Sequence, residues 1–217
     1  MDEAIAADRA RALGIVNVSR ETLERLDRFV ALLLTWQRTT NLIAPSTVLQ
    51  VWTRHIADSL QLIELAPAAR IWIDLGSGGG FPGLPIACAL AAMPGAAIHL
   101  VESNQKKAAF LREAARVTGA PAIVHAVRIE KFVDDFAPGA EAVTARAVAS
   151  LKVLLNECFI LLQKGAIGIF PKGQDVEAEL TEASKYWNMT VDLVPSRTDP
   201  KARIAVVRSL ERRQAGA

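Results

Sequence analysis

The sequence is poor in cysteine, in net charge and in long apolar runs, and each shortage excludes a class of protein. It holds 2 cysteines in 217 residues and a formal net charge of only +2. Cys88 and Cys158 lie in apolar helical contexts without C-x-x-C spacing, which predicts buried thiols in a reducing compartment and no metal site. The longest strongly apolar run, Phe29 to Leu34, is too short to span a bilayer. We expect a cytoplasmic protein without a membrane anchor, an export signal or a metal, and we expect a monomer.

Apolar residues are abundant, at 51% of the chain, so a core of ordinary domain size can form. Basic residues gather near the C-terminus, at Arg197, Lys201, Arg203, Arg208, Arg212 and Arg213. Only Asp199 and Glu211 oppose them within this stretch, an excess that suits contacts with phosphate groups. A solvated basic face without a binding role explains this pattern equally well.

The chain changes its hydrophobic period near residue 66. Before it, Leu23, Leu26, Phe29 and Leu33 recur at helical spacing after an N-cap signal at Ser19, and a second helix is expected from about residue 46 to 66. We therefore expect a helical extension over residues 1–66 and a second domain over residues 67–217.

After residue 66, short β-rich runs alternate with helical ones, which predicts an α/β fold: a doubly wound parallel sheet covered by helices on both faces. The last two strands have no helix between them and should pair as an antiparallel hairpin. The expected runs are strand 71–75, helix 84–92, strand 97–101, helix 105–117, strand 122–126, strand 142–145, helix 150–162, strand 166–170, helix 176–185, strand 190–195 and strand 203–209.

A glycine-rich turn follows the first strand and precedes a helix. One reading, Gly78-x-Gly80-x-x-Gly83, matches the dinucleotide-binding fingerprint. That motif holds a pyrophosphate with backbone N–H groups, and Pro82 and Pro85 remove such donors where they are needed. The turn is therefore a poor phosphate site.

The other reading begins earlier, with Asp74 at the strand end followed by Gly76-x-Gly78-x-Gly80. This pattern resembles motif I of class I S-adenosylmethionine-dependent methyltransferases. That family has a Rossmann-like, seven-stranded sheet with an antiparallel last strand, and its cofactor carries no phosphate. The resemblance implies S-adenosylmethionine as the cofactor, with Asp74, Gly76 and Gly78 among the cofactor-binding residues.

Further cofactor contacts are expected where later strands end, because ligands of doubly wound sheets bind at that edge. Glu102 ends the second strand and could accept hydrogen bonds from ribose hydroxyls. Ile129 and Glu130 follow the third strand and suit an adenine ring, although Glu130 could equally cap a helix. Arg146 ends the fourth strand and could hold the carboxylate of the cofactor, a substrate phosphate or a surface carboxylate.

Several stretches together resemble one family, the bacterial 16S ribosomal RNA guanine-N7 methyltransferases, once called glucose-inhibited division protein B. They are Asn41-Leu42, Arg54-His55-Ile56-Ala57-Asp58-Ser59-Leu60, Asp74 to Gly83, Arg146-Ala147 and Lys172-Gly173-Gln174. By this resemblance Gly76, Phe81, Ile129, Glu130 and Arg146 fall on cofactor-contacting positions. The chain departs from the family pattern at Ile43, Gly79, Ala145 and Pro171.

The resemblance implies methyl transfer to N7 of a guanine, with 16S ribosomal RNA or the small ribosomal subunit as the partner. N7 carries a lone pair and no proton, so we expect no catalytic acid or base. Arg54, His55, Lys172 and Arg197 are the candidates for contacting RNA, although a buried, hydrogen-bonded role suits His55 equally well. A small-molecule methyltransferase with a helical lid and a noncatalytic ribosome-assembly module are the alternatives.

Overall fold

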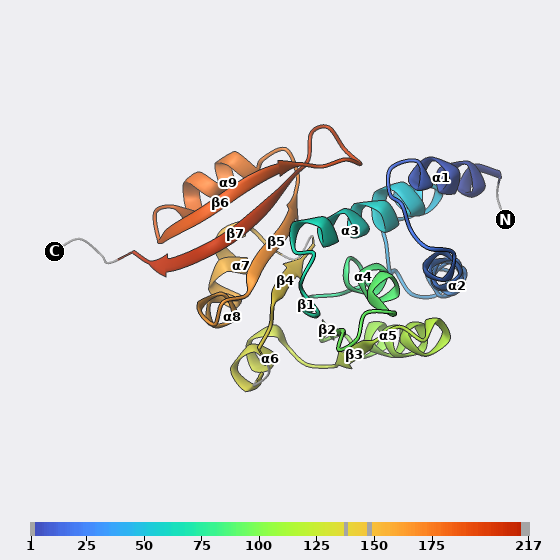
Figure 1. The fold of residues 1–217 in the computed structure, drawn as a ribbon, viewed down its shortest axis with the longest axis horizontal. Coiled ribbons are helices and arrows are strands. Elements are labelled where there is room, and N and C mark those ends of the chain that lie inside the picture. Colours follow the sequence, from blue (N-terminus) through green and yellow to red (C-terminus); the bar gives the residue numbers. More distant parts are fainter. Residues whose placement is uncertain (1–2, 137–138, 147–148, 214–217) are drawn as a thin grey trace.

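A computed structural model describes residues 3–136, 139–146 and 149–213, and a seven-stranded sheet forms their centre (Figure 1). The strand order is β3-β2-β1-β4-β5-β7-β6. Strands β1 to β5 pair in parallel, and β7 runs antiparallel to both β5 and β6. The bounds are β1 Ile71–Leu75, β2 Ala97–Val101, β3 Ala122–His125, β4 Ala142–Ala145, β5 Ile167–Lys172, β6 Trp187–Pro195 and β7 Arg203–Arg212. The doubly wound sheet and its final hairpin confirm the predicted fold class.

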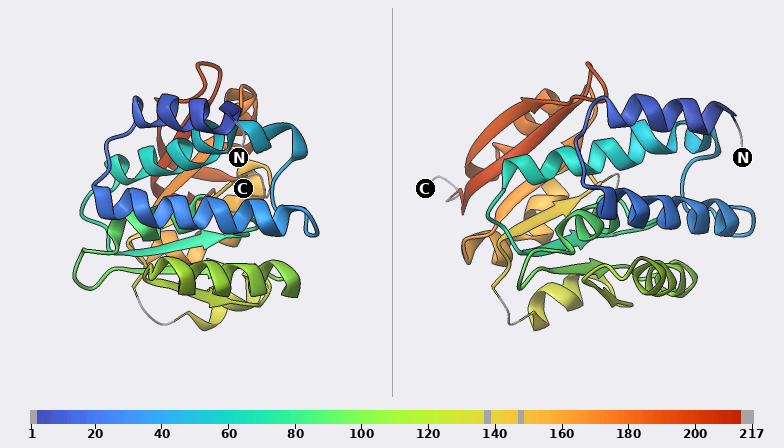
Figure 2. Two further views of the ribbon diagram at one scale, coloured as in Figure 1. Left: turned by 90° about the vertical axis from the view of Figure 1, so that its right-hand side faces the viewer. Right: turned by 45° about the vertical axis from the view of Figure 1, so that its right-hand side comes forward.

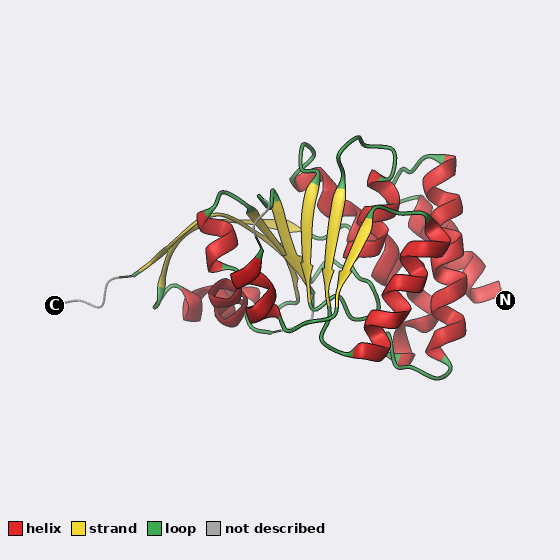
Figure 3. Cartoon of the chain, turned by 90° about the horizontal axis from the view of Figure 1, so that it is seen from below, coloured by secondary structure: helices red, strands yellow, loops and turns green. Residues whose placement is uncertain are grey.

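Helices cover both faces of the sheet (Figure 3), because successive strand residues point to opposite sides. On β1, Trp72 packs into the core beneath α2, α4 and α5, whereas Ile73 packs into the core beneath α6, α7, α8 and α9. The bounds are α2 Arg20–Gln37, α4 Gly83–Leu90, α5 Gln105–Thr118, α6 Ile129–Asp135, α7 Leu151–Glu157, α8 Phe159–Gln163 and α9 Val176–Ala183.

The N-terminal region is helical, as predicted. α1 (Glu3–Leu13) and α2 lie beside the later helical segment in both views of Figure 2. The side chain of Ser19 accepts a hydrogen bond from the backbone N–H of Thr22 at 3.1 Å, which confirms the expected N-cap. Leu26, Phe29 and Leu33 are fully buried, so this helix shares its core with the sheet.

The segment after Pro45 differs from the single helix that the sequence predicts. It is a succession of helical turns of different width: η1 (Pro45–Gln50), the wider π-type η2 (Trp52–Ala57), α3 (Asp58–Leu60) and η3 (Gln61–Leu65). Asp8 of α1 accepts hydrogen bonds from the backbone N–H groups of Trp52 and Thr53, at 2.9 and 3.2 Å, where η2 begins. The buried carboxylate thus fixes the start of the turn that carries Arg54 and His55.

Two other elements differ from expectation. The helix predicted over residues 150–162 is broken at Cys158 into α7 and α8, and no proline or glycine at this point signals the break. α6 was not predicted, because its seven residues are too few for a clear helical period. Both cysteines are free and buried, as expected. Among the described residues, no helix is long and apolar enough to cross a membrane.

Candidate cofactor and RNA site

The glycine-rich turn connects β1 to α4 at the point where the strand order reverses. Gly76, Gly78 and Gly80 have φ values of 68°, 55° and 90°, a left-handed region that side chains with a Cβ rarely adopt. The backbone N–H groups of Gly78, Gly80 and Gly83 already donate to Glu102, Ser77 and Asp74. Few backbone amides of the turn therefore remain to bind a pyrophosphate. This agrees with the interpretation of the sequence as a poor dinucleotide site.

Gly79, one of the departures from the family pattern, lies where the backbone of the turn comes close to the backbone at Leu42. A Cβ atom at this position would lie 2.7 Å from the backbone oxygen of Leu42. The loop that contains Leu42 is held to α2 by Gln37, whose Oε1 accepts from the N–H groups of Leu42 and Ile43 at 2.9 and 3.0 Å. The Asn41-Leu42 stretch thus supports the outside of the glycine turn.

Asp74 is buried at the end of β1. Its Oδ2 accepts a hydrogen bond from the backbone N–H of Gly83 at 3.1 Å, while Oδ1 has no protein partner in the described part of the chain. Burial raises the pKa of Asp74 to about 7, although the Gly83 amide and Arg146 oppose this shift. The unpartnered oxygen is a buried acceptor that a ligand cation or N–H group could satisfy.

Glu102 joins the second strand end to the turn. Its Oε2 accepts from the N–H of Gly78 at 2.9 Å, and its Oε1 accepts from the N–H of Asn104 at 2.7 Å. Each carboxylate oxygen can accept a second hydrogen bond, so the expected ribose contact remains available. The carboxylate also positions the turn, a role that sequence spacing did not suggest.

Ile129 and Glu130 open α6, beyond the end of β3. Ile129 is half-buried against the α6–α9 core, and Glu130 is exposed in the first helical turn. Both therefore lie at the same end of the sheet as Glu102. Their predicted contacts with adenine remain a prediction.

Arg146 lies between the glycine turn and η2. Its guanidinium carbon lies 5.2 Å from the centre of the Phe81 ring, and its Nη1 donates to the backbone oxygen of Arg54 at 3.1 Å. Its Nη2 donates to Nδ1 of His55 at 2.7 Å, and the His55 ring lies 4.8 Å from the Phe81 ring. Three residues predicted from different parts of the chain thus form one cluster. Ala147, the second member of the Arg146-Ala147 pair, lies outside the described residues.

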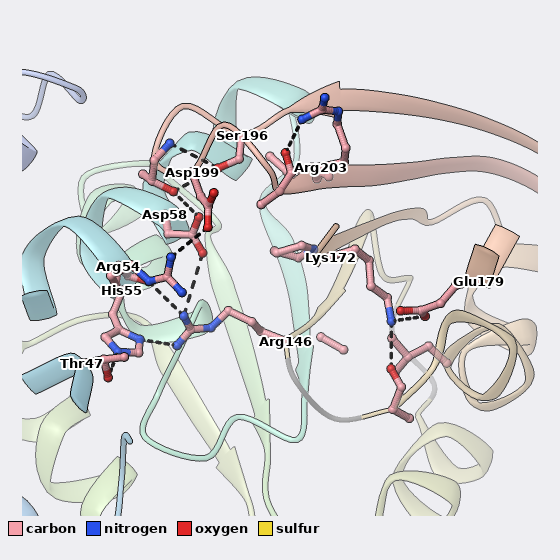
Figure 4. Close-up of a pocket in the computed structure, with 18 residues that line it drawn as sticks. Thr47, Arg54, His55, Asp58, Arg146, Lys172, Glu179, Ser196, Asp199 and Arg203 are labelled. Atoms are coloured by element: carbon pink, nitrogen blue, oxygen red, sulfur yellow. Dashed lines mark hydrogen bonds and ion pairs between the residues drawn. The ribbon is translucent and has the colours of Figure 1, made fainter. Parts of the chain in front are cut away.

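A cavity of about 400 Å³ opens beside this cluster, at the ends of β4 and β5 (Figure 4). Arg54, Asp58 and Arg146 line one side of it, and Lys172 and Glu179 line the other. Its remaining walls include Ser196, Thr198, Asp199 and Arg203 from the β6–β7 end of the sheet. The cavity therefore carries both cations and carboxylates among its lining residues.

The four residues expected to contact RNA have different surroundings. Arg54 is half-exposed and pairs with Asp199 at 2.9 Å. The side chain of Lys172 is only 8% exposed and donates to Glu179 and to a backbone oxygen, each at 2.8 Å. Arg197 is half-exposed, pairs with Glu64 and lies outside the cavity lining.

His55 is buried, and both of its ring nitrogens have protein partners: Nδ1 faces Arg146, and Nε2 lies 2.8 Å from the hydroxyl of Thr47. Burial, together with the charges of Arg146 and Arg54, lowers the pKa of His55 to about 3. The ring is therefore neutral and hydrogen-bonded within the protein. This agrees with the buried structural role that the sequence also allowed for His55.

The residues at the turn fit S-adenosylmethionine. The unpartnered Oδ1 of Asp74 and the spare lone pairs of Glu102 supply acceptors, and Arg146 supplies a cation. Within the turn itself, the N–H groups of Gly78, Gly80 and Gly83 already have partners, so a phosphate is a poor alternative ligand there. The cofactor contacts of Asp74, Gly76, Gly78, Phe81, Glu102 and Arg146 remain predictions.

Sequence reasoning did not single out Asp58, Gln61, Glu179 and Thr198. Asp58 lies within the Arg-His-x-x-Asp-Ser stretch and could have been selected from it. Gln61 and Thr198 lie far apart in the sequence, and only the fold shows that they share hydrogen bonds with Asp58.

Comparisons with known proteins identify the relatives of this chain. The family model GidB, described as rRNA small subunit methyltransferase G, matches residues 22–203. Ribosomal RNA small subunit methyltransferase G of Bradyrhizobium sp. strain BTAi1 is 59% identical over 208 residues, which cover 96% of this chain and 94% of that protein. Its namesake in Bradyrhizobium sp. strain ORS 278 is 56% identical over 209 residues, with the same coverage of 96% and 94%.

Solved structures share the fold. The O-methyltransferase TomG from Streptomyces achromogenes, solved in complex with SAM, superposes with a TM-score of 0.60 at 12% identity. The match covers 96% of this chain and 100% of that one. This likeness shows that the two chains share an overall fold.

Proposed function

Because this chain belongs to the GidB family, described as rRNA small subunit methyltransferase G, we propose that it transfers the methyl group of S-adenosylmethionine to N7 of a guanine in 16S ribosomal RNA. The observation that carries the proposal is the cavity beside the glycine turn, lined by Arg54, Arg146 and Lys172. It adjoins the residues that fit the cofactor, so a base held there lies next to the methyl donor.

The glycine turn and the strand ends hold the cofactor. When bound, S-adenosylmethionine supplies an electrophilic methyl group on a sulfonium. Glu102 fixes the turn through Gly78 and has lone pairs left for ribose hydroxyls, and Ile129 and Glu130 are proposed to border the adenine. Asp74 offers its unpartnered oxygen to a cationic or N–H group.

The chain needs no catalytic acid or base for this reaction. N7 of guanine has an in-plane lone pair and carries no proton, so the nucleophile is ready as it stands. Catalysis then comes from holding N7 in line with the methyl carbon, an effect that can supply about 7 to 11 kcal/mol in favourable cases. The cluster of His55, Phe81 and Arg146, in which each member contacts the others, is proposed to hold this alignment.

Cations both in the cavity lining and outside it favour RNA as the substrate. Arg54 and Arg197 are half-exposed and can exchange their carboxylate partners for phosphate. Lys172 is largely buried and is proposed to act at the cavity wall, and His55 is proposed to act through Arg146. The relatives at 56% and 59% identity, both named rRNA methyltransferases, disfavour the small-molecule and noncatalytic alternatives.

The proposal includes an organisation for the chain. We propose that residues 1–66 form a helical extension that supports the glycine turn, that residues 67–217 form the methyltransferase domain, and that the protein acts as a monomer in the cytoplasm.

Methyl incorporation tests the proposal. Purified protein is incubated with labelled S-adenosylmethionine and either naked 16S RNA or small ribosomal subunits from cells that lack the gene. Borohydride reduction followed by aniline cleavage, which breaks RNA at 7-methylguanine, locates the product. We expect incorporation at a single guanine in at least one of the two substrates. Incorporation without aniline cleavage would overturn the N7 assignment, and no incorporation in either substrate would overturn the function.

A further inference from the structure

Guanine differs from the other bases in the hydrogen-bond donors of its Watson–Crick edge, N1–H and the exocyclic N2 amino group. The cations of the cavity can donate to O6 or to phosphate, but adenine and cytosine also offer acceptors to a cation. A site that selects guanine therefore needs an acceptor of its own, and a carboxylate is a strong one. Three carboxylates line the cavity, from Asp58, Glu179 and Asp199.

Asp58 has one oxygen held by the protein and one facing the cavity. Its Oδ1 accepts from the hydroxyl of Thr198 at 2.6 Å and from the side-chain amide of Gln61 at 2.9 Å. In the described part of the chain, the one ion pair of its Oδ2 is with Nη1 of Arg146 at 3.9 Å (Figure 4). The side chain of Asp58 is 18% exposed. The carboxylate is therefore oriented in advance, with a free acceptor toward the cavity.

The support of this carboxylate comes from the opposite end of the chain. Oε1 of Gln61 accepts from the backbone N–H of Arg197 at 2.9 Å, and the amide of Gln61 also donates to Ser196 at 3.2 Å. The α3–η3 segment and the β6–β7 loop thus hold Asp58 together. Such support fixes the direction of a recognition group before the ligand arrives, which lowers the entropy cost of binding.

The other two carboxylates are less suited to the base. Oδ2 of Asp199 accepts from Arg54 at 2.9 Å, and Oδ1 accepts from the N–H of Lys201 at 3.0 Å. Glu179 is paired with Lys172 on the far side of the cavity from Arg146 (Figure 4). Asp58 alone of the three contacts the cluster that adjoins the glycine turn.

We propose that Asp58 determines specificity for guanine, with its Oδ2 accepting hydrogen bonds from N1–H and the N2 amino group of the target base. The inference rests on the proposed function and adds the group that reads the base. Adenine presents no N1–H and no N2 amino group to this oxygen, so it leaves the buried carboxylate without a donor.

Inosine provides the matched substrate, because it keeps N7, O6 and N1–H and lacks only the N2 amino group. Once the methylated position is located, 16S RNA that carries inosine at that position is made by ligation. It is brought into the same substrate form, naked RNA or small subunit, as the RNA that carries guanine. Single-turnover methyl transfer is compared for wild type, Asp58→Asn and the control Asp192→Asn. Asp192 pairs with Arg208 on the exposed hairpin and does not line the cavity. Cofactor affinity and thermal unfolding are measured for each protein.

Wild type and Asp192→Asn should methylate inosine RNA about 10- to 150-fold more slowly than guanine RNA, the range expected for a hydrogen bond to a charged group. Asp58→Asn should be slow on both RNAs and should lose most of this difference, because its amide offers a donor in place of Oδ2. Equal rates of wild type on the two RNAs would overturn the inference without any variant. An unchanged inosine effect in a folded Asp58→Asn would also overturn it. Absence of methyl transfer by wild type to guanine RNA would overturn the proposed function instead.

Discussion

Nη2 of Arg146 lies 2.7 Å from Nδ1 of His55, and this contact fixes the tautomer of the imidazole. A guanidinium group can only donate, so Nδ1 must accept and the ring hydrogen resides on Nε2. Nε2 then donates to the hydroxyl of Thr47, which donates to the backbone oxygen of Ala44 at 2.8 Å. The resulting chain of hydrogen bonds holds Arg146 against Phe81 with a neutral histidine.

The acceptor on His55 should be needed for RNA methylation. His55→Phe keeps a ring against Phe81 but removes Nδ1, and we expect kcat/KM for RNA to fall by about 10- to 100-fold, the value of a hydrogen bond to a charged group. His55→Asn keeps an acceptor near the Nδ1 position and should retain part of the activity. Cofactor affinity, measured by calorimetry, should fall less than kcat/KM for RNA, because Arg146 is only one of several predicted cofactor contacts. Equal activity of His55→Phe and wild type would show that Arg146 does not depend on this contact.

The same histidine should make folding stability depend on pH. Its pKa falls from the ordinary value of 6.5 to about 3 in the folded state, so the unfolded chain binds the proton more readily. Its contribution to stability is complete above pH 6.5 and is lost as the pH falls toward 3, by up to about 1.4 kcal/mol per pH unit. The free energy of unfolding, measured with urea, should therefore fall more steeply for wild type than for His55→Asn as the pH is lowered. His99 and His125 also have lowered pKa values, but they are common to both proteins and cancel. A difference independent of pH would contradict the buried neutral ring.

Glu102 should support the cofactor through the glycine turn. In Glu102→Gln an NH2 group replaces one of the two carboxylate oxygens. This donor then faces the backbone N–H of Gly78 or of Asn104, which loses its acceptor. We expect cofactor affinity to fall by about 1.5 to 3 kcal/mol and the RNA concentration for half-maximal rate to change little. Glu113→Gln, on the exposed surface of α5, is the matched control. Wild-type cofactor affinity in Glu102→Gln would remove this residue from the site.

Arg197 should contribute to RNA affinity through charge. Its side chain is 45% exposed, and Arg197→Gln should lower the slope of log affinity against log salt by about 0.7 to 0.9, the effect of one phosphate contact. Arg116→Gln removes an exposed arginine that pairs with Glu113 on α5 and should leave the slope unchanged. Filter binding at several salt concentrations measures both slopes. Equal slopes for the two variants would show that RNA is bound elsewhere, with Arg54 as the next candidate.

The sheet was predictable from the sequence because each strand has a short β-rich run and a clear boundary. The turn at Gly76 to Gly83 was predictable because glycine permits the positive φ values of a tight turn, whereas proline fixes φ and removes an N–H donor. The break at Cys158 was not predictable, because no local residue requires it and tertiary packing decides it.

The site was predictable only where it is local in sequence. Asp74 lies near the end of β1 and Glu102 directly follows β2, so the fold class places them at one edge. His55 and Asp58 each have one distant partner: Arg146 lies 91 positions from His55, and Thr198 lies 140 positions from Asp58. A single sequence carries no signal for such pairs. The pairing of Lys172 with Glu179 was likewise not expected, and it places a candidate RNA contact in a largely buried position.

Methyl transfer by an Arg146 variant tests the central claim most directly, because Arg146 joins the cofactor turn to the cavity. Arg146→Gln is compared with Arg116→Gln in single-turnover transfer to the RNA substrate of the wild type, with cofactor binding and thermal unfolding measured in parallel. We predict that Arg146→Gln stays folded and transfers methyl about 100-fold or more slowly, the loss expected when a reacting group is displaced by about 1 Å, while Arg116→Gln matches wild type. A folded Arg146→Gln that methylates the same guanine at the wild-type rate would contradict the account.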